Sequence, residues 1–282
     1  MNNFKNVNEI MEAYLGVIIQ KRELSFGKMF GKAIMAGAMI AFGAEASNVA
    51  AHTISDVGLA RTIAGAIFPV GLMMVILLGA ELFTGDCMLA IGLSSKSLKF
   101  RKLLQMLVTV YFGNFIGGFM IAFLTLQSGQ YNYSAEVLGA YTIKVALSKV
   151  NISFGSAIAS GILCNILVCA AVLMAMAATD VTGKLFASFF VILAFVTSGF
   201  EHCVANMYYI TAGLLCKLNP DYVNVAMERY KISAEQMDSL NIYGFLVKNL
   251  VPVTIGNILG GAVFLGIPLY YLTIANKKKD TE

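Results

Sequence analysis

The chain has 282 residues, of which 58% are hydrophobic and 13% are charged, and its mean hydropathy is +0.76. A soluble domain of this size is about one quarter charged, so the composition excludes an ordinary soluble protein. The net charge of +4 and the lack of a Walker loop, nucleotide fingerprint, metal cluster or Ser-His-Asp order argue against a nucleotide-dependent or metal enzyme. We expect an all-α integral membrane protein with one domain over residues 1–282, without cofactor or nucleic-acid partner.

The first 30 residues carry apolar side chains at helical spacing, but Glu9 and Glu12 interrupt any run long enough for a secretory signal. The spacing predicts an amphipathic helix over residues 1–30 that lies on the membrane interface. Its apolar face consists of Phe4, Val7, Met11, Tyr14, Leu15 and Ile18.

Six apolar stretches follow, and each supplies the roughly 20 residues that a helical crossing needs. Thirteen of the 20 Lys and Arg residues, including Lys277, Lys278 and Lys279, fall on one side of this membrane core. Because positive charge marks the cytoplasmic side, both termini are expected in the cytoplasm beneath the inner (plasma) membrane, and residues 217–245 form an outer loop. The core covers residues 33–273, with spans at about 33–54, 62–82, 103–126, 155–178, 185–215 and 246–273.

A G-N-x-x-G-G string occurs twice, at residues 113–118 in the third span and at residues 256–261 in the sixth. Small residues four apart lie on one helix face and allow close backbone approach in lipid. A repeat in the third helix of each half predicts two three-helix repeats, and an odd number of helices makes their topologies inverted.

The second and fifth spans are interrupted at matching places, residues 79–86 and residues 198–202, each with glycine and an acidic residue. The first piece of the fifth span, from Leu185 to Ser198, looks too short to cross alone. We therefore expect two broken helices. Unwound backbone at that depth must face protein or a cavity, so the breaks indicate a site near the membrane midplane.

His202 is the strongest candidate residue, because an ionisable side chain inside a span is costly and this one lies at a break. It is interpreted as a titratable gate, the alternative being a neutral histidine bonded to backbone. Thr84, on the other break, either donates to an anion or to the imidazole, or only caps a helix. His52 is expected at the interface, and the five cysteines are interpreted as small apolar packing residues.

Other polar residues of the spans have both a structural and a functional interpretation. Glu81 and Glu201 are proton-relay candidates, although a structural role that fixes the loops through backbone N–H groups is favoured. Lys149 either attracts anions or reaches toward the interface. Asn114, Asn165 and Asn257 are expected to join helices, and Asn165 and Asn257 are also candidates for the pore wall. Apolar residues near the breaks either pack or form a dewetting gate: Phe68, Leu72, Phe83, Val168 and Phe195.

These residues resemble the formate/nitrite transporter family, which includes formate, nitrite and hydrosulfide channels. The resemblance covers essentially all six spans. It is most specific at four ordered motifs: GAELFTG at 79–85, GILCNILVC at 161–169, GFEHCVAN at 199–206 and PVTIGN at 252–257. Cys203 replaces a serine that is common in the family, and Gly85 stands at a variable position.

The resemblance implies an aquaporin-like protomer in a homopentamer with one pore per subunit. Thr84 matches the threonine of the flexible loop, and His202 matches the central pore histidine. Lys149, Asn165 and Asn257 match polar vestibule and pore-wall positions. By the same resemblance Phe68 and Phe195 form an outer constriction, while Leu72, Phe83 and Val168 form an inner slit.

The predicted function is passage of a small monovalent anion, with formate first and nitrite or hydrosulfide as alternatives. An anion between apolar rings loses its hydration, and proton donation from His202 would let the neutral acid cross. Imidazole suits this role because its ordinary pKa is about 6.5. The competing interpretations are an electrodiffusive pore in which His202 stays neutral, a hydrosulfide exporter for sulfite reduction, an intramembrane enzyme that uses Glu201 and His202, and a membrane scaffold.

Overall fold

The computed structural model describes residues 4–275, which form helices connected by turns and one isolated bridge between Phe4 and Ala178. Lys277, Lys278 and Lys279 lie outside the described residues. The first half of the chain contains α1 (Val7–Arg22), α2 (Phe26–Ala51), α3 (Val57–Ile67), α4 (Pro69–Leu78), α5 (Phe83–Asp86), α6 (Ile91–Ser94) and α7 (Phe100–Gln127). The second contains α8 (Val137–Val150), α9 (Phe154–Ala177), α10 (Val181–Ser198), α11 (Cys203–Cys216), α12 (Pro220–Tyr230), α13 (Ala234–Ser239), α14 (Val251–Ile258) and α15 (Ile267–Thr273).

Six helices are long and apolar enough to cross a bilayer, as the sequence predicts. The fifth corrects an expectation, because α10 begins at Val181 rather than near Leu185, and its 18 residues are long enough to cross alone. The six are Phe26–Ala51, Val57–Leu78, Phe100–Gln127, Phe154–Ala177, Val181–Ser198 and Gly244–Thr273, the last including α14 and α15.

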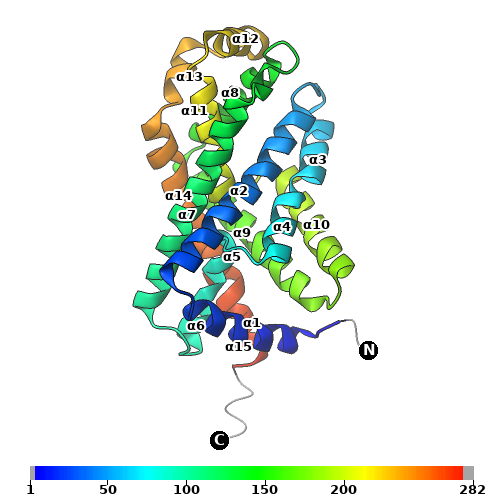
Figure 1. Ribbon diagram of the computed structural model, residues 1–282, viewed down its shortest axis with the longest axis vertical. Helices are drawn as coiled ribbons and strands as arrows, with labels where there is room; N and C mark the ends of the chain where they lie inside the picture. The colour runs from blue at the N-terminus through cyan, green and yellow to red at the C-terminus, as the bar shows by residue number, and fades with distance from the viewer. Residues whose placement is uncertain (1–3, 276–282) are drawn as a thin grey trace, which may run out of the picture.

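The two ends of the molecule differ in what covers them. α1 and α15 lie at one end, here called the α1 end, and α12 and α13 cover the opposite end, the α12 end (Figure 1). Asn6 caps α1 by accepting the N–H groups of Asn8 and Glu9, while the Glu9 carboxylate accepts the N–H of Asn6. This capping box fixes the start of α1, and its apolar face is then buried through Ile10, Met11, Tyr14 and Ile18.

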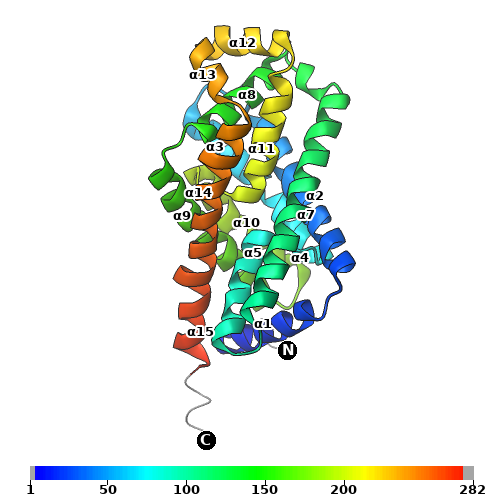
Figure 2. The same cartoon turned by 90° about the vertical axis from the view of Figure 1, so that its left-hand side faces the viewer.

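The two halves repeat one another in opposite orientations, which confirms the predicted inverted repeats. α2 begins at the α1 end, whereas α9 ends at it. The hydrogen bond from the N–H of Lys5 to the carbonyl of Ala177, at 2.9 Å, shows this position of the end of α9. Each of these helices is followed by a broken helix and then by a long one. The helices that follow the breaks, α5 and α11, lie on opposite sides of the middle of the molecule (Figure 2).

The repeated glycines pack the third long helix of each half against the first. A Cβ added at Gly117 of α7 would overlap the carbonyl of Ile34 in α2. One added at Gly260 would overlap the carbonyl of Ile162 in α9 in the same way. Only glycine permits this backbone contact, which explains the repeated G-N-x-x-G-G string.

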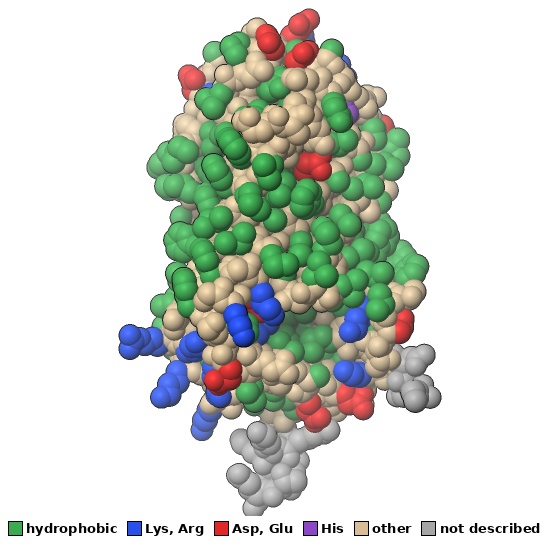
Figure 3. Space-filling view, in the orientation of Figure 1, with side chains coloured by type: hydrophobic (Ala, Val, Ile, Leu, Met, Phe, Trp, Pro, Cys, Tyr) green, Lys and Arg blue, Asp and Glu red, His purple; other side chains and the backbone are tan. Residues whose placement is uncertain are grey.

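The surface is sorted by polarity along the long axis. Apolar side chains cover the middle of the face in Figure 3, while Lys and Arg side chains gather toward the α1 end. A wide apolar band with charge at its ends is the surface expected of a helix bundle in a bilayer.

Candidate functional site

Both breaks begin at a glycine in the left-handed region. α4 ends at Gly79 with φ of 64°, and α10 ends at Gly199 with φ of 74°. Glycine adopts this conformation without the steric cost of a Cβ. After each glycine, three residues are non-helical, and a new helix begins at Phe83 in the first break and at Cys203 in the second.

Asn114 of α7 holds the first break in place. Its Oδ1 accepts the N–H of Phe83 at 2.9 Å, and its Nδ2 donates to the carbonyls of Ala33 at 2.7 Å and Glu81 at 3.0 Å. The side chain is completely buried. The Phe83 N–H and the Glu81 carbonyl, which the break removes from helical bonding, thereby have hydrogen-bond partners.

Asn257 does the same at the second break. Its Oδ1 accepts the N–H of Cys203 at 2.9 Å, and its Nδ2 donates to the carbonyls of Gly161 at 2.8 Å and Glu201 at 3.0 Å. The two asparagines of the G-N-x-x-G-G strings therefore fix equivalent backbone groups. A pore-wall role for Asn257 stays a prediction, because this amide is engaged with backbone and fully buried.

Thr84 and His202, one from each break, meet at the centre. Thr84 Oγ1 and His202 Nε2 are 2.9 Å apart, and the two residues are 0% and 3% exposed. Residues 118 positions apart in sequence are thus in direct contact. The sequence predicted a Thr84 hydroxyl that donates to an anion or to the imidazole; the structure brings Thr84 to the imidazole, and the other ring nitrogen decides which group donates.

The bonding of the imidazole assigns its proton. Nδ1 of His202 accepts the N–H of Ala205 at 3.0 Å and so caps α11. A ring nitrogen that accepts a hydrogen bond carries no proton, so the proton of the neutral ring is assigned to Nε2, which donates to Thr84. The Thr84 hydroxyl then retains its own proton for another acceptor.

Asn165 of α9 positions Thr84 through its backbone carbonyl. Its Nδ2 donates to the carbonyl of Thr84 at 3.1 Å and to that of Asn257 at 2.6 Å. Cys169 contributes a weaker Sγ contact to the same Thr84 carbonyl at 3.4 Å. Asn165 is completely buried, so its bonds support the break, and a direct contact with a passing anion stays a prediction.

Glu81, the acidic residue of the first break, forms an ion pair with a lysine of the N-terminal helix α1. Lys21 Nζ of α1 lies 2.6 Å from Glu81 Oε2 and 2.5 Å from Asp86 Oδ1, and both carboxylates are 3% exposed. Burial alone would lower the pKa of Lys21, but Asp86 and Glu81 raise it well above its usual value. This cluster ties α1 to the break and to α5.

Glu201 of the second break has an equivalent arrangement. Lys149 Nζ of α8 lies 2.9 Å from Glu201 Oε1, while Oε2 accepts from Asn206 at 2.6 Å and Asn249 at 3.2 Å. Both acidic residues therefore fix their breaks through ion pairs and amides, not through the backbone N–H groups expected from the sequence. Lys149 also lies 5.2 Å from the ring centre of Tyr209.

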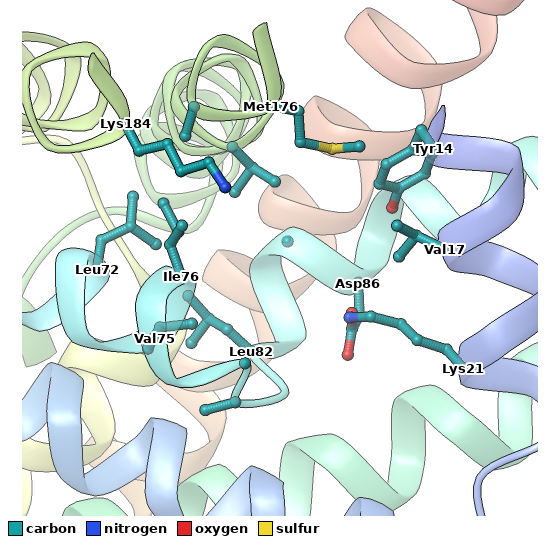
Figure 4. Close-up of a pocket in the computed structure, with 15 residues that line it drawn as sticks. Tyr14, Val17, Lys21, Leu72, Val75, Ile76, Leu82, Asp86, Met176 and Lys184 are labelled. Carbon is teal, nitrogen blue, oxygen red and sulfur yellow. The ribbon is translucent and has the colours of Figure 1, made fainter. Parts of the chain in front are cut away.

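Two cavities approach the Thr84–His202 pair from opposite ends. The α12-side pocket has a volume of about 220 Å³ and reaches His202 past Phe68 and Phe195. The α1-side pocket has a volume of about 300 Å³ and reaches Leu72, Leu82 and Gly85. In Figure 4 Lys21 and Asp86 meet at one side of the α1-side pocket, while Lys184 extends toward it from the other.

The apolar residues expected to form constrictions are all buried, at 2–3% exposure. The rings of Phe68 and Phe195 meet edge-on at 5.6 Å, beside the imidazole. Phe83 instead stacks edge-on against Tyr111 at 4.9 Å, and its neighbour Leu82 faces the α1-side pocket. Leu82 was not singled out in the sequence, because periodicity cannot orient residues at a helix break. Val168 contacts neither pocket.

Of the remaining candidates, His52 lies away from the centre. His52 bonds to the carbonyl of Val49 at 2.7 Å and to Ser134 Oγ at 2.8 Å, near the α12 end. All five cysteines are free and buried. Among residues 4–275, no group of three His, Cys, Asp or Glu side chains is arranged to hold a metal ion.

The geometry agrees with what comparison with known proteins finds. The formate/nitrite transporter family model matches residues 8–271. The formate channel FocA of Haemophilus influenzae is 36% identical, over 86% of this chain and 86% of that protein. A solved structure described as a pentameric formate channel with formate bound has a TM-score of 0.77 and 31% identity, covering 88% of this chain and 97% of that one.

A more distant structure identifies the fold alone. An aquaglyceroporin from Plasmodium falciparum is 14% identical and has a TM-score of 0.52, covering 88% of this chain and 100% of that one. The aquaporin-like arrangement of inverted repeats is thereby confirmed. From the family match, the relatives and the six apolar helices, this chain belongs to the formate/nitrite transporter family of multi-pass membrane proteins.

Proposed function

We propose that this protein passes a small monovalent anion, with formate as the best candidate, across the plasma membrane. The α1 end would face the cytoplasm and the α12 end the outside. The names of the relatives support formate, since they include a formate channel and a formate-bound structure. The same pentameric relative supports assembly of this chain as a homopentamer, and the two cavities that approach the Thr84–His202 pair within one subunit support a pore in each subunit.

The observation that carries the proposal is the buried Thr84–His202 pair between two cavities. An anion that leaves water for an apolar passage needs hydrogen bonds in place of its hydration shell. The Thr84 hydroxyl and the Nε2–H of His202 are two donors at one point. An anion between them would receive both, at a place where both residues are almost completely buried.

We further propose that His202 supplies a proton to the anion. A doubly protonated ring would transfer its Nε2 proton to a formate oxygen, leaving neutral imidazole and neutral formic acid. The second proton must sit on Nδ1, where it displaces the bond from Ala205 N–H. Proton uptake is therefore coupled to the first turn of α11, and the neutral acid then passes the apolar residues more easily than the anion.

Proteoliposomes containing the purified protein test this function. We expect uptake of labelled formate above that of empty liposomes, rising as pH falls, and slower uptake in His202→Phe. Parallel measurements with nitrite and hydrosulfide identify the preferred anion, and a clear preference for hydrosulfide would replace formate with the alternative. Uptake that is the same in the wild type and His202→Phe at every pH would contradict the proposed role of the histidine.

A further inference from the structure

The charges that line the α12-side pocket do not cancel. Its charged residues are Arg61, Lys149 and Glu201. Lys149 is paired with Glu201 at 2.9 Å, so this lysine contributes little net potential to the cavity. The Arg61 guanidinium forms no ion pair or hydrogen bond with any residue in the range 4–275, and it therefore carries the net positive charge of the pocket.

Arg61 is placed at the mouth of this cavity by α3. Its guanidinium carbon lies 3.8 Å from the position that a Cβ on Gly199 would occupy, so the group rests against the turn that ends α10. Burial and Tyr230 raise the pKa of Tyr141, and Arg61 opposes this increase, which places its charge near the Tyr141 hydroxyl. Tyr141 lines the same pocket.

Two amides that line this pocket have one atom without a partner among the described residues, the donor Nδ2 of Asn48 and the acceptor Oδ1 of Asn206. Asn48 of α2 lines the cavity and is 6% exposed, and its Nδ2 has no hydrogen-bond partner among the described residues. The adjacent Ser47 donates to the carbonyl of Ala64 at 3.1 Å, which joins this turn of α2 to the turn of α3 that follows Arg61. Buried amide donors are normally satisfied, so an unpaired one at a cavity is suited to an external acceptor.

We propose that Arg61 and Asn48 form an anion-capture site in the α12-side pocket, ahead of the Thr84–His202 pair. The site would take a small monovalent oxyanion such as formate, with the guanidinium supplying charge and the amide supplying a hydrogen bond. The proposal rests on the proposed anion transport. It assigns recruitment of the anion to Arg61 in place of Lys149, whose charge Glu201 offsets.

A structural role for Arg61 predicts different behaviour. A cation beside the end of α10 also stabilises the negative end of the helix dipole. In that case loss of the charge would lower thermal stability and leave the formate concentration for half-maximal uptake unchanged. Thermal unfolding of Arg61→Gln is therefore measured together with its formate uptake, and we expect the half-saturating concentration to change with little change in stability.

Formate uptake into proteoliposomes in low salt tests the charge. For Arg61→Gln we expect the half-saturating formate concentration to rise about two- to fivefold, the effect of one unit charge at several ångströms in a hydrated cavity. Added inert salt should reduce the difference, because it screens exposed charges. Arg61→Lys should behave nearly as the wild type, and Arg61→Glu should show a larger increase than Arg61→Gln.

Lys144→Gln is the matched control. Lys144 lies on the same end of the molecule, over the ring of Tyr230 at 4.7 Å, and it lines a neighbouring cavity but not the α12-side pocket. The substitution removes the same charge from a residue that does not line the α12-side pocket, although Lys144 Nζ lies 5.7 Å from the ring centre of Tyr141, which does. Equal half-saturation and salt dependence in Arg61→Gln and Lys144→Gln would overturn the proposal, whereas absence of uptake by the wild type would instead refute the proposed function.

Asn48→Leu tests the amide separately. Leucine has a similar volume, and removal of an unpaired buried donor should leave thermal stability unchanged or higher. We expect the half-saturating formate concentration to rise about fivefold, corresponding to one lost hydrogen bond. A variant that is as stable as the wild type and has unchanged half-saturation would show that Asn48 does not contact the anion.

Discussion

Replacement of Lys21 by methionine should lower the free energy of unfolding by more than is usual for a residue on a surface helix. Lys21 is the shared partner of Glu81 and Asp86, whose side chains are 3% exposed, while its own side chain is 21% exposed. Removal of one partner from a buried ion pair costs about 3–5 kcal/mol, and the partial exposure of Lys21 reduces this to about 2–4 kcal/mol. Lys32, at 3.9 Å from Glu81 and 43% exposed, can compensate only weakly.

Thermal unfolding followed by a thiol-reactive fluorophore measures this loss, because all five cysteines are buried and free. Lys28→Met is the control, since Lys28 is exposed and has no ion pair within residues 4–275. We expect it to change stability by less than about 0.5 kcal/mol. The triple variant Lys21→Met, Glu81→Gln, Asp86→Asn should recover much of the loss, because it leaves no uncompensated buried charge.

If Lys21→Met and Lys28→Met unfolded at the same temperature, the cluster would not hold α1 to the break. If the triple variant were no more stable than Lys21→Met, the loss would come from packing of the lysine stem and not from charge.

Three further substitutions test the central pair and the breaks. Thr84→Val keeps the side-chain shape but removes the hydroxyl, so formate uptake should fall at least about tenfold, as expected for a lost bond to a charged group; uptake at the wild-type rate would contradict its role. Asn257→Leu removes the side-chain partner of the Cys203 N–H and of the Glu201 carbonyl at the break, and a loss of about 2 kcal/mol or more is expected in thermal unfolding, whereas wild-type stability would show that the break does not depend on them. Gly199→Ala places a Cβ at φ of 74° and should cost about 1 kcal/mol, so an equally stable variant would show that the turn relaxes freely.

The sequence predicted the main features of the fold because they depend on local composition. Apolar length identified the six spans, and the repeated glycines predicted close helix packing, whose partners, α2 for α7 and α9 for Gly244–Thr273, came from the structure. Helix boundaries were less accurate. Thr182, Gly183 and Lys184 interrupt the apolar run and hid the first turn of α10, and the 14-residue α8 is too short for a hydropathy window to separate from a loop.

Partners across the fold could not be predicted in the same way. The sequence indicated that Thr84 and His202 lie on equivalent breaks, and the family resemblance paired them. Nothing local shows that Lys149 neutralises Glu201, that Lys21 binds two carboxylates, or that the amide of Asn48 is left without a partner. These contacts join residues far apart in the chain, and they depend on how the two repeats interlock.

In the proposed mechanism, His202 of the Thr84–His202 pair gives one proton to each anion that passes. Simultaneous measurement of formate uptake and internal pH in proteoliposomes tests it most directly, with the wild type and His202→Phe compared at equal protein content. We expect about one proton to enter with each formate in the wild type, and we expect His202→Phe to lose this proton-coupled uptake. Formate uptake without any proton, carried by an electrical current in the wild type, would contradict it.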